Sequence, residues 1–202
     1  WWRIVILLDV KLDRAAAFDE ANRLQKRAQK GTWSYMGSAM QKLLVGRVDE
    51  ADTDFDHAAK EGVLPLVWRF KAQAKWEYAD AQAKDVAALA MKTEPEDPGT
   101  AATLALIQAE DDLDTATKEL DRILGETPKF AWAALAKAKA TMRAKKWDAV
   151  PPLLDAAAKL APAGPETEFL RGKALLELGK LDDADAAFTK AVTWDANFAD
   201  AL

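Results

Sequence analysis

Small and apolar residues recur along the chain at helical spacing. Ala184, Phe188 and Ala191 form an A-x3-F-x2-A ladder, and residues 51–58 repeat the same ladder earlier in the chain. Residues seven apart lie on one face of a helix, two turns from each other. The two alanines of a ladder would let a neighbouring helix approach closely, while the phenylalanine between them fills the space beneath. The pattern therefore predicts amphipathic helices that pack in pairs.

The ladder returns at a nearly constant period. Stepping back from the last ladder by 34, 34, 33, 32 and 34 residues brings small or apolar residues into equivalent positions each time. We expect each unit to hold two amphipathic helices of about 12–15 residues joined by a tight turn. The predicted units are 1–31, 32–63, 64–96, 97–130, 131–164 and 165–198, and residues 199–202 begin a further unit.

Glycine and proline mark the expected helix ends. Gly46 and Gly179 can adopt the left-handed conformation that ends a first helix. Pro95, Pro128 and Pro162 are expected to end second helices, because proline lacks the backbone donor and clashes with the preceding turn. One hairpin cannot bury both of its faces, so neighbouring units must stack to form a core.

This pattern resembles the tetratricopeptide repeat (TPR) family, whose period is about 34 residues with a W-x2-L-G-x2-Y…A-x3-F…P pattern. The resemblance covers the whole chain and is strongest in units 131–164 and 165–198. It implies an all-α fold, a right-handed α-solenoid of about six helix-turn-helix repeats. The high Ala, Asp and Trp content and the loose consensus suggest a bacterial member.

The resemblance also implies a concave groove that is lined by the first helix of each unit and holds a ligand. Carrying the register over puts a set of aromatic, aliphatic and basic residues there: Met36, Met40, Trp68, Trp76, Trp132, Leu135, Lys139, Met142, Arg143, Phe169, Lys173 and Leu176. Aromatic and Arg side chains are frequent binding hot spots, and Met adapts to irregular surfaces. The alternative is that these residues pack hairpin against hairpin, as we expect for Trp147.

The predicted function is a non-catalytic scaffold that binds a peptide or helix of a partner protein in its concave groove and organises a multiprotein assembly. Two alternatives remain: the substrate-recruiting arm of a larger enzyme, and a self-assembling structural spacer. Some family members bind acidic C-terminal tails through a clamp of asparagines and lysines on first helices. The only asparagines here are Asn22 and Asn197, outside the first helices, so that clamp is incomplete.

Composition argues against several other functions. The chain has no cysteine, which excludes disulfides and thiolate metal sites. The single histidine, His57, is expected to be an exposed helix residue, and the acidic runs 110–112 and 182–183 to cap helices. A net charge of −5 without a basic stripe argues against nucleic acid as a partner. We expect no catalytic residues, no cofactor and no metal.

The two ends of the sequence carry the last expectations. The apolar opening, residues 1–8, is too short to span a bilayer, which needs about 20 apolar residues, so we expect a buried helix. Neither end supplies the polar capping helix that a solenoid needs. This predicts a fragment of a longer repeat protein or self-association through the ends. The absence of cysteine suits bacterial cytoplasm and periplasm equally.

Overall fold

Helices make up most of the computed structural model, which describes residues 1–62, 66–161 and 164–194. These ranges hold twelve α-helices, one 3-10 turn and no strand, which confirms the predicted all-α fold. The elements are α1 (Trp2–Asp9), α2 (Arg14–Ala28), α3 (Thr32–Leu44), α4 (Val48–Glu61), α5 (Val67–Glu77), α6 (Ala83–Thr93), α7 (Pro98–Gln108), α8 (Leu113–Glu126), α9 (Ala131–Arg143), η1 (Trp147–Ala149), α10 (Val150–Leu160), α11 (Pro165–Glu177) and α12 (Leu181–Trp194). Pro162 and the predicted further unit 199–202 lie outside the described residues.

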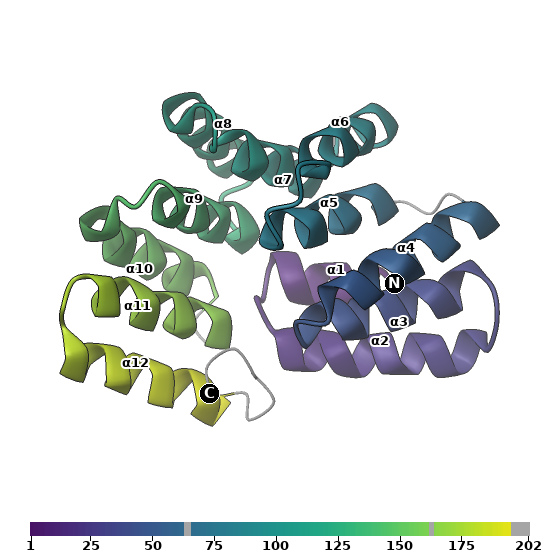
Figure 1. Cartoon of the computed structure of the whole chain (residues 1–202), viewed down its shortest axis with the longest axis horizontal. Coiled ribbons are helices and arrows are strands. Elements are labelled where there is room, and N and C mark those ends of the chain that lie inside the picture. Colours follow the sequence, from purple (N-terminus) through teal and green to yellow (C-terminus); the bar gives the residue numbers. More distant parts are fainter. Residues whose placement is uncertain (63–65, 162–163, 195–202) are drawn as a thin grey trace.

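The helices of the described residues pair in chain order into six hairpins, from α1–α2 to α11–α12. The hairpins stack side by side into a strongly curved array (Figure 1). The helices α6, α8 and α12 lie on its outside, whereas α5, α7 and α9 lie nearer the middle. The curvature brings the first hairpin, drawn in purple in Figure 1, to face the green and yellow hairpins at the end of the chain.

The two kinds of helix differ in burial because they occupy different layers. The inner helix α9 is buried over nearly its whole surface, from Ala131 to Met142. The outer helix α8 buries a single stripe, formed by Ala116, Leu120 and Ile123. A one-sided stripe is typical of a helix with one face in solvent. An inner helix instead has neighbours on several sides.

The apolar core forms two clusters that meet at α5. Phe70 belongs to the cluster built from α1 to α5, and Trp76 belongs to the cluster that continues to α11. Leu12 is an exception, because it follows α1 in the chain but is buried in the C-terminal cluster. The first hairpin is therefore packed against the last ones.

Four first helices end in the same turn. Gly46 and Gly179 adopt the predicted left-handed conformation, with φ of 75° and 72°. Ala79 and Lys145 take the same conformation at the equivalent places, with φ of 56° and 57°. In each turn the next N–H donates to the carbonyl five residues back, as Asp80 N does to Lys75 O at 3.0 Å. This is the hydrogen bond of a Schellman motif.

The prediction for His57 is confirmed, and that for the acidic runs is confirmed at Asp112, whereas Glu110 and Asp111 form ion pairs with Arg143 and Lys84. The Asp112 side chain caps α8 by accepting a hydrogen bond from Thr115 N at 3.0 Å, and Asp182 lies in the first turn of α12. His57 is exposed on α4, where its ring packs 5.0 Å from that of Tyr35.

Candidate functional site

A cleft with a volume of about 400 Å³ opens between the N-terminal and C-terminal hairpins. One wall comes from α3 and from the end of α5, and the other comes from α9, the turn after it and α11. Six of the twelve predicted groove residues line the cleft: Trp76, Lys139, Met142, Arg143, Phe169 and Lys173. The repeat register thus brings half of the predicted set to one cavity.

Three predicted groove residues lie inside the core instead. Met36, Met40 and Leu135 are each 0% exposed. Packing from neighbouring hairpins covers these side chains, so a partner cannot reach them in this conformation. We therefore correct the predicted lining by leaving these three out.

The remaining three predicted residues lie apart from the cleft. Trp132 is 4% exposed and lines a separate small cavity of about 30 Å³. Trp68 is half-buried in the first turn of α5, and Leu176 is exposed near the end of α11. Neither of these two side chains lines the cleft.

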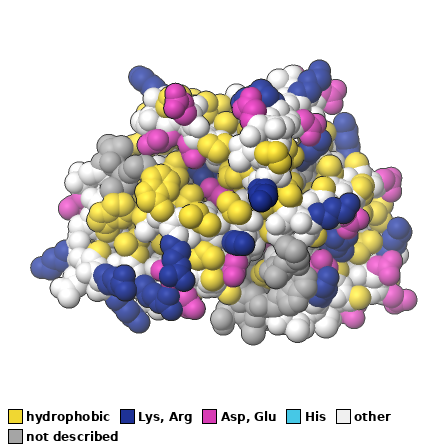
Figure 2. Space-filling view, turned by 180° about the vertical axis from the view of Figure 1, so that it is seen from behind, with side chains coloured by type: hydrophobic (Ala, Val, Ile, Leu, Met, Phe, Trp, Pro, Cys, Tyr) yellow, Lys and Arg dark blue, Asp and Glu magenta, His cyan; other side chains and the backbone are white. Residues whose placement is uncertain are grey.

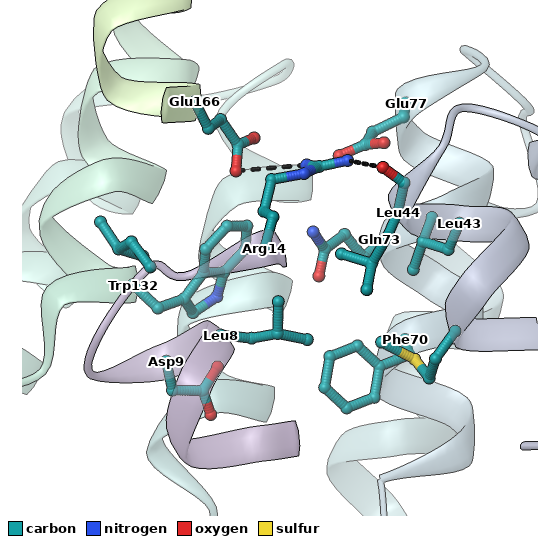
Figure 3. A pocket seen from close by; sticks show the side chains of 12 residues that line it. Leu8, Asp9, Arg14, Leu43, Leu44, Phe70, Gln73, Glu77, Trp132 and Glu166 are labelled. Atoms are coloured by element: carbon teal, nitrogen blue, oxygen red, sulfur yellow. Dashed lines mark hydrogen bonds and ion pairs between the residues drawn. The ribbon is translucent and has the colours of Figure 1, made fainter. Parts of the chain in front are cut away.

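Four charged side chains form the floor of the cleft. Glu166 accepts from both sides, with Lys139 Nζ at 2.5 Å and Arg14 Nη1 at 3.3 Å. Lys139 Nζ also lies 3.3 Å from Glu77 Oε1, and Arg14 Nη2 donates to the Leu44 carbonyl at 2.9 Å. Figure 3 shows the Arg14 guanidinium extended between Glu166 and Leu44. We call Arg14, Glu77, Lys139 and Glu166 the floor cluster.

The charges of the floor cluster stabilise each other against the cost of burial. Burial raises the pKa of Glu166, but the positive charges of Lys139 and Arg14 outweigh it and hold that pKa at about 2. Burial likewise lowers the pKa of Lys139, while Glu166 and Glu77 outweigh this effect and raise it above the ordinary value. Both groups are therefore charged at neutral pH, and neither can lose its partner without leaving a buried charge unpaired.

The floor cluster connects hairpins that are far apart in the chain. Arg14 begins the second helix of the first hairpin, Glu77 ends α5 of the third, and Lys139 and Glu166 belong to the fifth and sixth. In most solenoids each repeat contacts only its neighbours. Here the ion pair between Arg14 and Glu166 joins the first repeat directly to the sixth, and both residues line the cleft.

A second buried ion pair joins the first hairpin to the third. Arg69 on α5 is 1% exposed and makes a two-pronged contact with the carboxylate of Asp9 on α1. Its Nη1 also lies 3.8 Å from Asp97, the N-cap of α7. A Cβ on residue 99 would overlap the guanidinium, so Gly99 leaves the space that Arg69 occupies.

Cations and aromatic rings alternate on the cleft walls. The Arg143 guanidinium lies 5.0 Å from the centre of the Trp76 ring, and Lys173 Nζ lies 5.4 Å from that of Phe169. Both distances suit cation–π attraction. Arg143 also makes an ion pair of 3.0 Å with Glu110. The walls can thus accept an apolar side chain beside negatively charged groups.

A separate apolar surface lies on the first two hairpins. Trp2 and Ile6 of α1 are 59% and 53% exposed, and Trp33 of α3 is 39% exposed. Figure 2, seen from behind, shows large apolar side chains gathered at the left, on the side of the N-terminal hairpins. None of these three residues lines the cleft.

Sequence reasoning missed several residues of the cleft. Arg14, Glu77 and Glu166 reach it only through the curvature of the array, which the local pattern does not report. Trp147, expected in the core, is half-buried and lies on the cleft wall in a 3-10 turn. Lys145 could have been placed in a turn from the repeat period, because it lies 34 residues before Gly179.

The described part of the chain holds neither a metal site nor a membrane-spanning helix. There, no three histidine, aspartate or glutamate side chains come together as a metal site. In the same residues no helix is both long and apolar enough to cross a bilayer.

Comparison with known proteins identifies the architecture. No family model matches the chain, and no curated protein sequence is significantly similar to it. Among solved structures, TTC0263, a thermophilic TPR protein of Thermus thermophilus, is 20% identical with a TM-score of 0.67; the match covers 85% of this chain and 95% of that one. A chain of the APC/C hetero-tetramer Cut9-Hcn1 is 14% identical with a TM-score of 0.52; the match covers 98% of this chain and 46% of that one. Yeast Tom70 is 18% identical with a TM-score of 0.50, over 96% and 42%.

At these sequence identities the similarity shows a shared fold and nothing beyond it. Six stacked helical hairpins, left-handed turns between their helices and the match to TTC0263 agree with one another. The chain has the fold of a TPR-like helical-repeat solenoid.

Proposed function

We propose that the chain is a non-catalytic scaffold that binds a peptide or helix of a partner protein in the cleft and helps to organise a multiprotein assembly. The cleft itself carries the proposal, because its walls combine aromatic, methionine and basic side chains around about 400 Å³. Concave sites with apolar walls and a few polar groups are the usual places for ligands. The fold-level similarity to a chain of the Cut9-Hcn1 hetero-tetramer agrees with a role in assembly.

The proposal is tested by selecting peptides from a random display library against the full chain. Binding of the selected peptides should change the tryptophan emission, because Trp76 and Trp147 line the cleft. The Phe169→Ala variant removes an aromatic ring from the wall, so it should weaken binding by about tenfold or more, as expected for a hot spot.

Leu89→Ala is the matched control, since Leu89 is exposed on α6 and does not line the cleft. Circular dichroism should show that both variants keep the helical fold. Peptides that bind wild type and Phe169→Ala with equal affinity would contradict the assignment of the cleft, and failure to select any peptide would contradict the proposed function.

A further inference from the structure

The cleft is positively charged although the whole chain is negatively charged. Five cationic and two anionic side chains line it, an excess of three positive charges, whereas the chain carries a net charge of −5. A concave surface of one sign attracts ligands of the opposite sign. This local reversal of charge points to an anionic ligand.

The positive excess is located at the rim and not at the floor. In the floor cluster, Glu166 and Glu77 compensate Lys139 and Arg14. Arg143 is paired with Glu110, which lies outside the lining, so two of the three excess charges have no anionic partner among the described residues. Lys145 and Lys173 are exposed at the rim, and neither forms an ion pair with any residue that the structure describes. These two ammonium groups are therefore available to a ligand's carboxylates without breaking an internal ion pair.

Lys145 lies in the repeat turn that follows α9. Its φ of 57° lies in the left-handed region, where glycine stands in the equivalent turns at Gly46 and Gly179. A non-glycine residue in this region is strained by about 1–2 kcal/mol. The strained position here carries a cation that lines the cleft.

Apolar surface lies beside these cations. Trp147 and Phe169 are half-buried and expose the rest of their rings to the cleft. Lys173 Nζ is 5.4 Å from the centre of the Phe169 ring, so an apolar group on that ring would lie next to a positive charge. The chemistry that fits is an apolar side chain flanked by carboxylates.

Resting on the proposed function, we propose that the ligand is an acidic internal segment of a partner protein, whose Asp or Glu side chains contact Lys145 and Lys173 while an apolar side chain packs on Trp147 and Phe169. The two lysines belong to different elements, the turn after α9 and the middle of α11. Two lysines on different elements suit a ligand whose carboxylates are spaced along a peptide segment. The cleft lining contains no asparagine or glutamine among the described residues that could complete a clamp on a single terminal carboxylate.

The first test uses the peptides selected from the random library. Analogues with Asn or Gln in place of Asp or Glu should bind at least about tenfold more weakly, and the difference should shrink as NaCl rises from about 0.1 M to about 1 M, because the Debye length falls from ~10 Å to ~3 Å. Amidating the C-terminus of a peptide should leave its affinity unchanged.

The second test reverses the charge of the rim. Lys145→Glu/Lys173→Glu should weaken binding of the acidic peptides at least about tenfold and should favour analogues that carry lysine in place of the acidic residues. Lys26→Glu/Lys92→Glu is the control, with the same net charge and two exposed lysines that do not line the cleft.

The outcomes separate this inference from the proposed function. Peptides that need Phe169 but lack acidic residues, or that bind equally well after Asn or Gln substitution, overturn the acidic ligand and leave the cleft as a binding site. Peptides that lose affinity on amidation overturn the internal segment. If no peptide depends on Phe169, both proposals fail.

Discussion

Glu166 holds a negative charge between two cations in the interior, and this arrangement sets how the molecule responds to acid. Its pKa of about 2 lies below the ordinary 4.5 because Lys139 and Arg14 stabilise the carboxylate more than burial penalises it. A carboxylate with a lowered pKa stabilises the fold above its unfolded pKa. That stabilisation is lost as the pH falls from about 4.5 towards 2.

We expect Glu166→Gln to lower the free energy of unfolding by about 3 kcal/mol at neutral pH, because it leaves Lys139 without its main partner. The difference between wild type and variant should disappear between pH 4.5 and 2, since a pKa change of this size corresponds to about 3 kcal/mol. Urea unfolding of both proteins over this range measures it, and a difference that stays constant with pH would contradict the assignment.

The Arg69–Asp9 pair allows a double-mutant cycle. Asp9→Ala should lower the free energy of unfolding by about 3–5 kcal/mol, because it leaves the buried guanidinium with only the more distant Asp97. Adding Arg69→Met removes that unpaired charge, so the double variant should be more stable than Asp9→Ala alone. Denaturant unfolding of all four proteins gives the coupling energy. If Asp9→Ala and the double variant lost the same free energy of unfolding, Asp9 would not compensate the charge of Arg69.

At the scale of the element, the turns decide where each hairpin folds back. Gly46 and Gly179 could be predicted from the sequence, because glycine adopts the left-handed region without penalty. Ala79 and Lys145 could not be identified by residue type, since alanine and lysine disfavour that region. The hydrogen bonds that end α5 and α9 impose the same turn on them. Repeat geometry therefore overrides local preference.

Ala79→Gly should raise the free energy of unfolding by about 0.5–1 kcal/mol, because relief of the left-handed strain exceeds the extra entropy lost by glycine. The reciprocal change, Gly46→Ala, should lower it by a similar amount at the equivalent turn. Urea unfolding compares the two variants with wild type. A shift of the same sign in both would contradict the strain that we assign to these turns.

At the scale of the whole molecule, curvature creates the site. The sequence period predicts which side chains face inwards, and Trp76, Lys139 and Phe169, which it selects, line the cleft. It does not report how sharply successive hairpins turn, since small differences in packing add up over the array. Contacts such as Arg14 with Glu166, 152 residues apart, could therefore not be predicted, and neither could the burial of Met36.

The central claim is that the first hairpin packs against the last ones in solution. Leu12 Cβ lies 3.5 Å from the place of a Cβ on residue 164, a separation within the range of disulfides. Because the chain has no cysteine, Leu12→Cys/Gly164→Cys carries only this pair. A Leu89→Cys/Gly164→Cys variant serves as the control.

Mild oxidation at low protein concentration, read by non-reducing electrophoresis and by mass spectrometry of the linked peptides, tests this claim most directly. The closed array predicts an intramolecular disulfide between residues 12 and 164 in nearly all molecules and none in the control. Two cysteines that stay reduced and react freely with an alkylating reagent, or that link only between molecules, would contradict it.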